Sequence, residues 1–206
     1  SEADEKAIDA QQSPHQFSQD LGAVQDDGLN GYVAGIGASL DDRTHRLDMP
    51  YSYRVLNANY VNAYTFPGGS VGVTRGIMTE MRNEAELAAL LGHELGHVNA
   101  RHSAQRQGQA MVGQAALVGL NVAVATSESA SRWGGLINIA GQVGASALLA
   151  SYSRDNEREA DALGQEYMTR AGYPATGMVG LHELLVSRHE GSPGLLDTMF
   201  ATHPMA

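Results

Sequence analysis

Two histidines four positions apart, with a glutamate directly after the first, lie in a segment of helix-forming residues. Positions i and i+4 share one face of an α-helix, so His93 and His97 can both direct a ring nitrogen at one metal ion. Glu94 then lies beside the open coordination position, where a carboxylate can take a proton from water. The pattern therefore requires a helix here and predicts half of a zinc-hydrolase site. Coincidence is the alternative, which the apolar helical setting disfavours.

The residues around this motif predict a helix that follows a small sheet. Asn83 can cap the helix, and Glu86 three residues later gives the capping-box arrangement, so a helix is expected from about Glu84 to about Gln105. Alternating residues with high strand propensity predict strands over 51–56, 61–66 and 70–74, and a further amphipathic helix should begin at Asp27. The expected fold class is α+β, a mainly helical domain with a small three-stranded sheet before the helix that carries His93 and His97.

Composition restricts the class of protein. The chain has 206 residues, of which 43% are hydrophobic and 17% charged, so a single globular domain over residues 1–206 is expected. The formal net charge of -10 argues against nucleic acid as a partner, because phosphate binding needs clustered Lys and Arg. The chain has no cysteine, so neither a thiolate zinc site nor a disulfide framework can form.

Two segments differ from the rest in composition. Residues 1–25 are polar and predict a loosely held arm or a short helix. Residues 108–150 are rich in Ala, Gly and Val and predict a buried helical hairpin, because their most apolar part is shorter than the ~20 residues of a membrane span. Membrane contact by this hairpin is the alternative. Residue 1 is Ser, with no apolar targeting stretch before the domain, which favours a processed chain whose leader has been removed.

A later helix supplies candidate carboxylates for the metal. This helix is expected from about Arg154 to Ala171 and is ended by Gly172. Glu157 and Asp161 are four residues apart on it and share one face. One carboxylate would complete the metal site, and the other would accept the remaining ring N–H of a ligand histidine. An ordinary charged helix with exposed ion pairs is the alternative.

Two further histidines are interpreted as structural. His102 is one residue short of the metzincin spacing, so it is expected at the end of the active-site helix rather than on the metal. His182 lies on an otherwise apolar helix, expected over 176–189, and is interpreted as a core histidine.

These motifs, in this order, resemble the zinc metalloproteases that include HtpX and the CAAX prenyl proteases, the Peptidase_M48 domain. The resemblance is carried by residues 62–69, 73–76, 83–102 and 153–161 and is greatest to the soluble members of the bacterial envelope. It implies a gluzincin domain with one Zn²⁺ per chain. The implied ligands are His93, His97 and Glu157, with Glu94 as base and Asp161 orienting a ligand histidine. Unfolded or misassembled proteins in the bacterial periplasm or envelope are the implied substrates.

The resemblance suggests two further roles. Asn62, Ala63 and Tyr64 would lie on an edge strand beside the cleft, where an extended peptide can add through main-chain hydrogen bonds. An ordinary strand is the alternative for this segment. His203 would act as a fourth, regulatory ligand that blocks the metal and holds the enzyme latent, and a histidine in a free tail is the alternative.

Two other functions compete with peptide hydrolysis. One is a latent or inactive zinc-binding holdase that binds unfolded envelope proteins, and the other is a purely structural zinc site. Glu94 beside an open site of two histidines and one carboxylate favours the catalytic interpretation. For the group that stabilises the oxyanion, the sequence offers His203, Arg154 and the tyrosines as candidates without selecting one.

Overall fold

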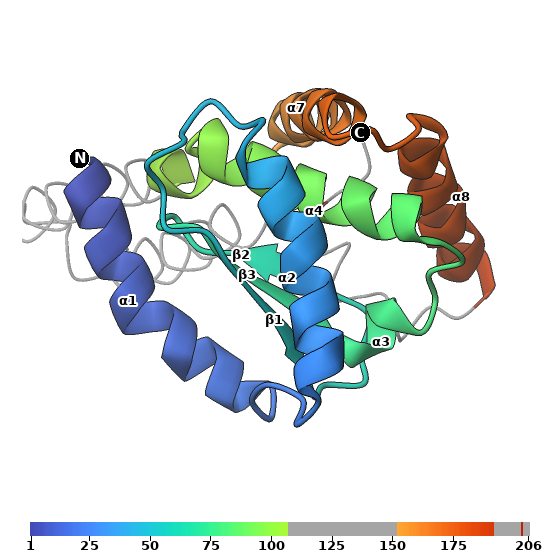
Figure 1. The fold of residues 1–206 in the computed structure, drawn as a ribbon, viewed down its shortest axis with the longest axis horizontal. Coiled ribbons are helices and arrows are strands. Elements are labelled where there is room, and N and C mark those ends of the chain that lie inside the picture. Colours follow the sequence, from blue (N-terminus) through green and yellow to red (C-terminus); the bar gives the residue numbers. More distant parts are fainter. Residues whose placement is uncertain (107–151, 192–202, 204–206) are drawn as a thin grey trace, which may run out of the picture.

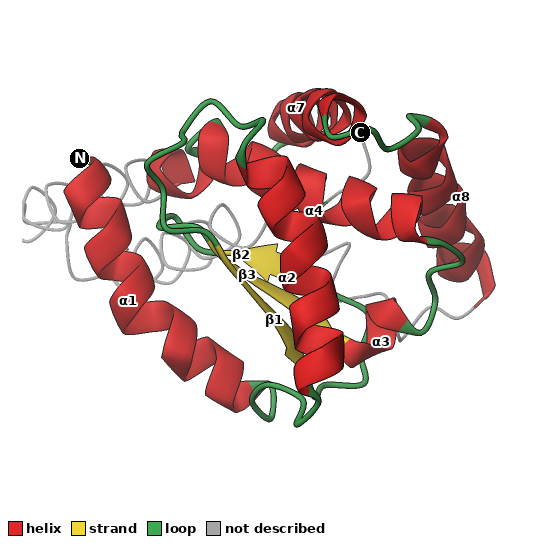
Figure 2. Cartoon of the chain, viewed as in Figure 1, coloured by secondary structure: helices red, strands yellow, loops and turns green. Residues whose placement is uncertain are grey.

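The computed structural model describes residues 1–106, 152–191 and 203, and within this part the fold is α+β and mainly helical (Figures 1 and 2). The apolar segment 108–150, predicted as a hairpin, lies outside the described residues. The described helices are α1 (Glu2–Gln19), α2 (Asp27–Asp41), α3 (Arg75–Met78), α4 (Glu84–Asn99), α7 (Arg154–Arg170) and α8 (Thr176–Gly191). The described strands are β1 (Ser52–Leu56), β2 (Ala63–Thr65) and β3 (Ser70–Thr74).

The three predicted strands are confirmed and form one mixed sheet in the order β1-β3-β2. β3 is the central strand, parallel to β1 and antiparallel to β2. The turn between β2 and β3 includes Gly69, whose φ of +97° is a conformation that favours glycine. Since β2 pairs with β3 alone among the described strands, it is an edge strand, and it also lies against α4.

The predicted amphipathic helix is confirmed as α2. Its apolar residues Val33, Ile36 and Leu40 are buried in the core, with Val55 of β1. Figure 1 shows α2 crossing in front of the sheet, with α4 running across one end of it. The core therefore lies between the sheet and these helices.

The N-terminal segment is an 18-residue helix docked on the domain, so the alternative of a loose arm is wrong and the predicted helix is longer than expected. Its buried residues are polar: Glu5, Asp9 and Ser13. Glu5 accepts hydrogen bonds from Arg46 at 2.6 Å and from Arg101 at 2.9 Å. Asp9 accepts one from the backbone N–H of Ser70 at 2.9 Å. Buried polar contacts thus attach α1 to the domain, together with the packing of Phe17 against Tyr64 and Phe66.

Helix α4 begins as predicted and ends six residues earlier than expected. The Asn83 side chain accepts from the Glu86 backbone N–H at 3.1 Å, as a capping residue should. The Glu86 carboxylate does not complete a capping box; it accepts instead from the backbone and side chain of Arg82. The helix ends at Asn99 because Arg101 adopts φ +60°, a left-handed conformation that no α-helix continues.

Helices α4 and α7 cross with almost no side chain between their backbones. A Cβ added to Gly96 would lie 2.6 Å from the carbonyl oxygen of Ala160, and one added to Gly92 would lie 2.8 Å from that of Gly164. Real Cβ atoms do not approach so closely, so these α4 positions require glycine for this crossing. The predicted helices are confirmed as α7, which ends before Gly172 at φ +97°, and α8.

Among the described helices, none is both long enough and apolar enough to cross a membrane.

The helix crossing generates a stability prediction. Gly96→Ala should destabilise the protein by about 1–3 kcal/mol, because the new methyl group meets rigid backbone rather than a movable side chain. Gly35→Ala is the control: Gly35 is exposed in the interior of α2, and a Cβ there meets nothing within 4 Å. That variant should gain up to about 1 kcal/mol of helix propensity. Urea unfolding measures both, and equal stability of the two variants would contradict the close crossing.

Candidate metal centre

Four buried side chains from α4, α7 and the C-terminal region converge on one point. His93 and His97 come from α4, Glu157 from α7, and His203 from beyond α8. One ligand atom from each lies within 4.8 Å of all the others. The Nε2 atoms of His93 and His97 are 3.0 Å apart. The nearest carboxylate oxygen of Glu157 lies 3.4 Å from His93 Nε2 and 3.5 Å from His97 Nε2.

The far side of each α4 histidine ring is held by a hydrogen bond. His93 Nδ1 lies 2.8 Å from Asp161 Oδ1, and since an ionised carboxylate only accepts, Nδ1 carries the proton. His97 Nδ1 lies 2.9 Å from Nδ1 of His102. A neutral histidine with its proton on Nδ1 has a lone pair on Nε2. In His93 that lone pair faces the centre of the cluster.

The cluster also contains buried carboxylate oxygens without hydrogen-bond partners. Both oxygens of Glu94 and Oε1 of Glu157 have none within the described part of the chain. Such groups are costly to bury unless they are paired or coordinate a cation. Two imidazoles, one carboxylate and a second carboxylate close by form the donor set that Zn²⁺ prefers in catalytic sites. The residues present therefore fit a zinc ion.

The pKa shifts of the cluster have physical causes that agree with this fit. Burial raises the pKa of Glu94 and lowers the pKa of His97 well below its usual 6.5. Burial also acts to lower the pKa of His93, but the bonds to Asp161 and Glu157 outweigh it and raise this pKa to about 10. In the absence of a cation, this raised pKa favours a proton on His93 Nε2, and a metal ion bound there would have to displace that proton.

His203 lies inside this cluster. Its Nδ1 is 3.4 Å from His93 Nε2 and 3.3 Å from Glu157 Oε2, while its Nε2 is 3.8 Å from Glu94 Oε1. The side chain is 5% exposed. The interpretation of His203 as a free-tail histidine is therefore wrong, because the ring occupies the space between the proposed base and the other side chains.

Three residues around His97 were missed or misplaced by sequence reasoning. His102 is not at the end of a long helix but is fully buried beside His97, because α4 stops at Asn99 and the chain turns back. Its Nε2 lies 3.2 Å from Glu159 Oε2. Tyr152 stacks on the His97 ring with centroids 3.9 Å apart and an interplanar angle of 26°. A periodicity argument has no signal for Tyr152, and it misplaced His102 because α4 ends before position 102.

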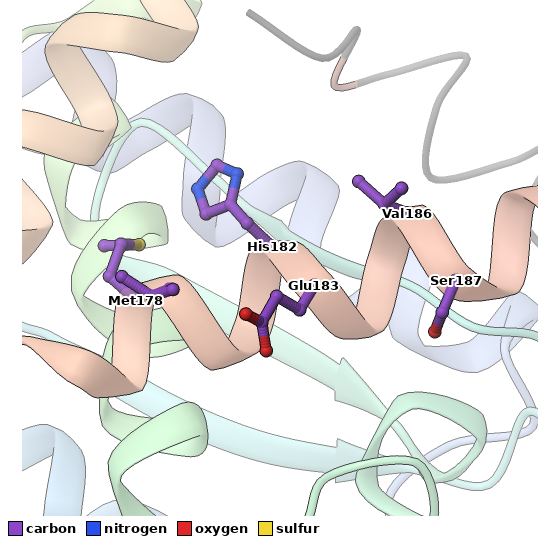
Figure 3. A pocket seen from close by; sticks show the side chains of 6 residues that line it. Met178, His182, Glu183, Val186 and Ser187 are labelled. Carbon is purple, nitrogen blue, oxygen red and sulfur yellow. The ribbon is translucent and has the colours of Figure 1, made fainter.

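His182 is also not the core histidine that its helix suggested. Its side chain is 44% exposed, and Nε2 lies 3.3 Å from Asp161 Oδ2. Bonds from His182 and His93 outweigh the effect of burial and lower the pKa of Asp161. His182 also lines an open, mainly apolar hollow of about 540 Å³ along α8 (Figure 3). The other lining residues are Met178, Val179, Glu183, Val186 and Ser187.

The fold and this donor set define the class of protein: a metal-dependent hydrolase whose helix α4 carries two histidines and an adjacent glutamate. Residues 8–206 match the model of Peptidase family M48, so the chain belongs to this family. It is a zinc metalloprotease, as the resemblance implied.

Named relatives agree with this assignment. The chain is 32% identical to "Metalloprotease YcaL" of Escherichia coli (strain K12) over 206 residues, 99% of this chain and 76% of that protein. It is 30% identical to the "Putative beta-barrel assembly-enhancing protease" of Vibrio cholerae over 192 residues, 88% of this chain. It is 31% identical to the "Mitochondrial metalloendopeptidase OMA1" of Schizosaccharomyces pombe over 157 residues, 75% of this chain. The chain spans 38% and 44% of the length of the last two relatives.

Proposed function

We propose that this chain is a single gluzincin-type domain that uses one Zn²⁺ to hydrolyse internal peptide bonds of unfolded or misassembled envelope proteins. The observation that carries the proposal is the buried cluster of His93, His97 and Glu157 with the unpartnered carboxylate of Glu94 beside it. A purely structural zinc site is closed by its protein ligands and does not require a second buried carboxylate with two unpartnered oxygens.

In this mechanism His93, His97 and Glu157 hold the metal, and Asp161 fixes the orientation of His93 through the 2.8 Å bond. Bound there, zinc would polarise the scissile carbonyl and acidify the attacking water. Glu94 takes the proton of that water and then passes it to the leaving amine. Burial favours this double role, because it raises the pKa of Glu94 and so makes its carboxylate a stronger base towards the attacking water.

The cellular setting is proposed from the relatives. Several are named for enhancing β-barrel assembly, and in bacteria such barrels lie in the outer membrane. This supports a place for the chain in the periplasm or envelope, with misassembled proteins as substrates. Such a role does not require the chain itself to contact a membrane.

The edge strand β2 is the proposed site for an extended substrate. The backbone N–H of Phe66 donates to Ser70 O at 2.9 Å, and that of Thr74 donates to Asn62 O at 3.0 Å. Because antiparallel ladders alternate, the backbone groups of Ala63 and Thr65 point away from β3. Ala63 is completely buried, so a peptide added to this edge would bond to the partly exposed Thr65, while Asn62 and Tyr64 bond within the sheet. Recognition through main-chain atoms suits substrates of varied sequence.

The catalytic proposal predicts that Glu94→Gln keeps the metal and removes activity. The amide cannot accept the proton of the attacking water, so cleavage of unfolded casein should fall by several powers of ten. Zinc content should stay at one per chain, as measured by atomic absorption. Glu84→Gln, an exposed change in the first turn of the same helix, should behave like the parent.

Three results would contradict this proposal. Proteolysis that persists in Glu94→Gln would remove Glu94 from the mechanism. Absence of zinc in the parent would remove the metal site. Suppression of casein aggregation without cleavage, in the presence or absence of a chelator, would favour the holdase.

The position of His203 predicts a latent enzyme. His203→Ala should raise the rate of casein cleavage several-fold, because the ring occupies the space between Glu94 and Glu157 where water must bind. His15→Ala, on the exposed face of α1, is the control and should leave the rate unchanged. A fall in rate for His203→Ala would instead make His203 part of the catalytic set, as a stabiliser of the oxyanion.

The edge-strand proposal predicts an effect on KM. Thr65→Pro removes a backbone N–H that forms no hydrogen bond within the sheet, so the protein should stay folded. KM for an unfolded substrate should rise about fivefold, which corresponds to the loss of one hydrogen bond of ~1 kcal/mol. Thr65→Val removes the hydroxyl, keeps the N–H and serves as the matched control. Unchanged KM in Thr65→Pro would place the substrate elsewhere.

A further inference from the structure

A second histidine and a carboxylate lie in line behind His97. His102 Nδ1 is 2.9 Å from His97 Nδ1, and His102 Nε2 is 3.2 Å from Glu159 Oε2. The His102 side chain is completely buried, whereas that of Glu159 is 59% exposed. The line of contacts therefore runs from the centre of the metal cluster to the surface of α7.

The chemistry of the end group determines where each proton lies. An ionised carboxylate only accepts, so His102 Nε2 carries the proton that points at Glu159. A neutral His102 then has a lone pair on Nδ1, which accepts a proton from His97 Nδ1. His97 is left with its Nε2 lone pair directed at His93 and Glu157, the orientation that a metal ligand requires.

We propose that His102 and Glu159 are positioning residues that fix the tautomer and ring orientation of His97 for metal binding. This inference deepens the proposed function, since it concerns the same site. Asp161 accepts a hydrogen bond from His93 directly, whereas Glu159 acts on His97 through the imidazole of His102. Both ring nitrogens of His102 are engaged by this line, which leaves no lone pair for the metal itself.

The backbone explains how a residue five positions after His97 reaches this place. On a continuing helix, position 102 would lie more than one turn beyond His97 and on a different face. The end of α4 at Asn99 and the left-handed Arg101 turn the chain, so the next helical turn returns His102 to the His97 ring. Tyr152 stacks on the face of the His97 ring and so restricts its rotation.

The first test uses metal affinity. Competition with a chromophoric chelator should show that His102→Leu weakens zinc binding about 10–100-fold, the usual effect of losing a hydrogen-bond partner behind a ligand. His102→Asn should recover most of the affinity, because its side-chain oxygen can accept from His97 Nδ1. Glu159→Gln should weaken binding only a few-fold, because its amide oxygen still accepts a hydrogen bond. Asp155→Asn removes the same charge at an exposed position of α7 and should change nothing.

The second test needs neither substitution nor metal. Long-range ¹H–¹⁵N spectra of the parent protein report which nitrogen of each imidazole carries the proton. We expect the Nδ1–H form of His97 and the Nε2–H form of His102. The reverse pair, with His97 protonated on Nε2, would overturn the inference even if zinc binds.

The two tests separate the failure of this inference from the failure of the proposed function. Equal loss of affinity in His102→Leu and His102→Asn would mean that His102 only fills space, and it would overturn the positioning role. Unchanged affinity in His102→Leu would do the same. A parent protein that binds no zinc would overturn the proposed function, while the spectra would still decide the tautomers.

Discussion

The close crossing of α4 and α7 is the contact on which the metal centre depends. Glycines at positions 92 and 96 let the backbone of α4 touch that of α7 at Ala160 and Gly164. The functional side chains lie beside these contacts, so the separation of the helices fixes the distance between His93 and Asp161 at 2.8 Å. Hydrogen bonds weaken steeply when they are stretched by a few tenths of an ångström. The glycines are therefore as much a part of the site as the histidines.

The same crossing buries polar groups that an apolar core would exclude. Glu94 and His97 are fully buried, and three carboxylate oxygens in the cluster have no hydrogen-bond partner within the described residues. Uncompensated burial of such groups costs several kcal/mol, so the folded domain without metal is destabilised at this point. A bound cation would offset that cost, which couples metal binding to folding. The same buried carboxylates and histidines therefore determine both the stability of the domain without metal and its ability to bind one.

Local patterns in the sequence were sufficient for elements whose buried face is apolar or whose ends carry capping residues. This holds for α2, for the three strands, for the start of α4 and for α7 with its terminal glycine. The spacing of His93, His97, Glu157 and Asp161 also predicted which side chains would meet. The end of α4 was mispredicted because Arg101 takes φ +60° there, and an arginine, unlike a glycine, does not signal that conformation. The misplacement of His102 followed directly from it.

Helix α1 shows a second limit of prediction from sequence patterns, and its contacts bear on the mispredicted end of α4. Its buried residues Glu5, Asp9 and Ser13 recur every four positions, so the stripe that faces the domain is polar. Hydrophobic periodicity finds no helix face there, so the sequence could predict no more than a loose arm or a short helix. Yet Glu5 binds Arg101 at 2.9 Å and Arg46 at 2.6 Å, and Arg46 donates to the carbonyl of Val98 at 2.9 Å.

These contacts hold the end of α4 in place. A left-handed conformation at a residue such as Arg101 costs about 1–2 kcal/mol, which must be offset by its surroundings. The buried carboxylate of Glu5 accepts a hydrogen bond from that same residue, worth about 1 kcal/mol because the Arg101 side chain is half exposed and the charge is screened by solvent. Since the turn at Arg101 places His102 against His97, the N-terminal helix contributes to the geometry of the metal centre without touching it. The polar stripe of α1 therefore supports the turn that places His102 beside His97.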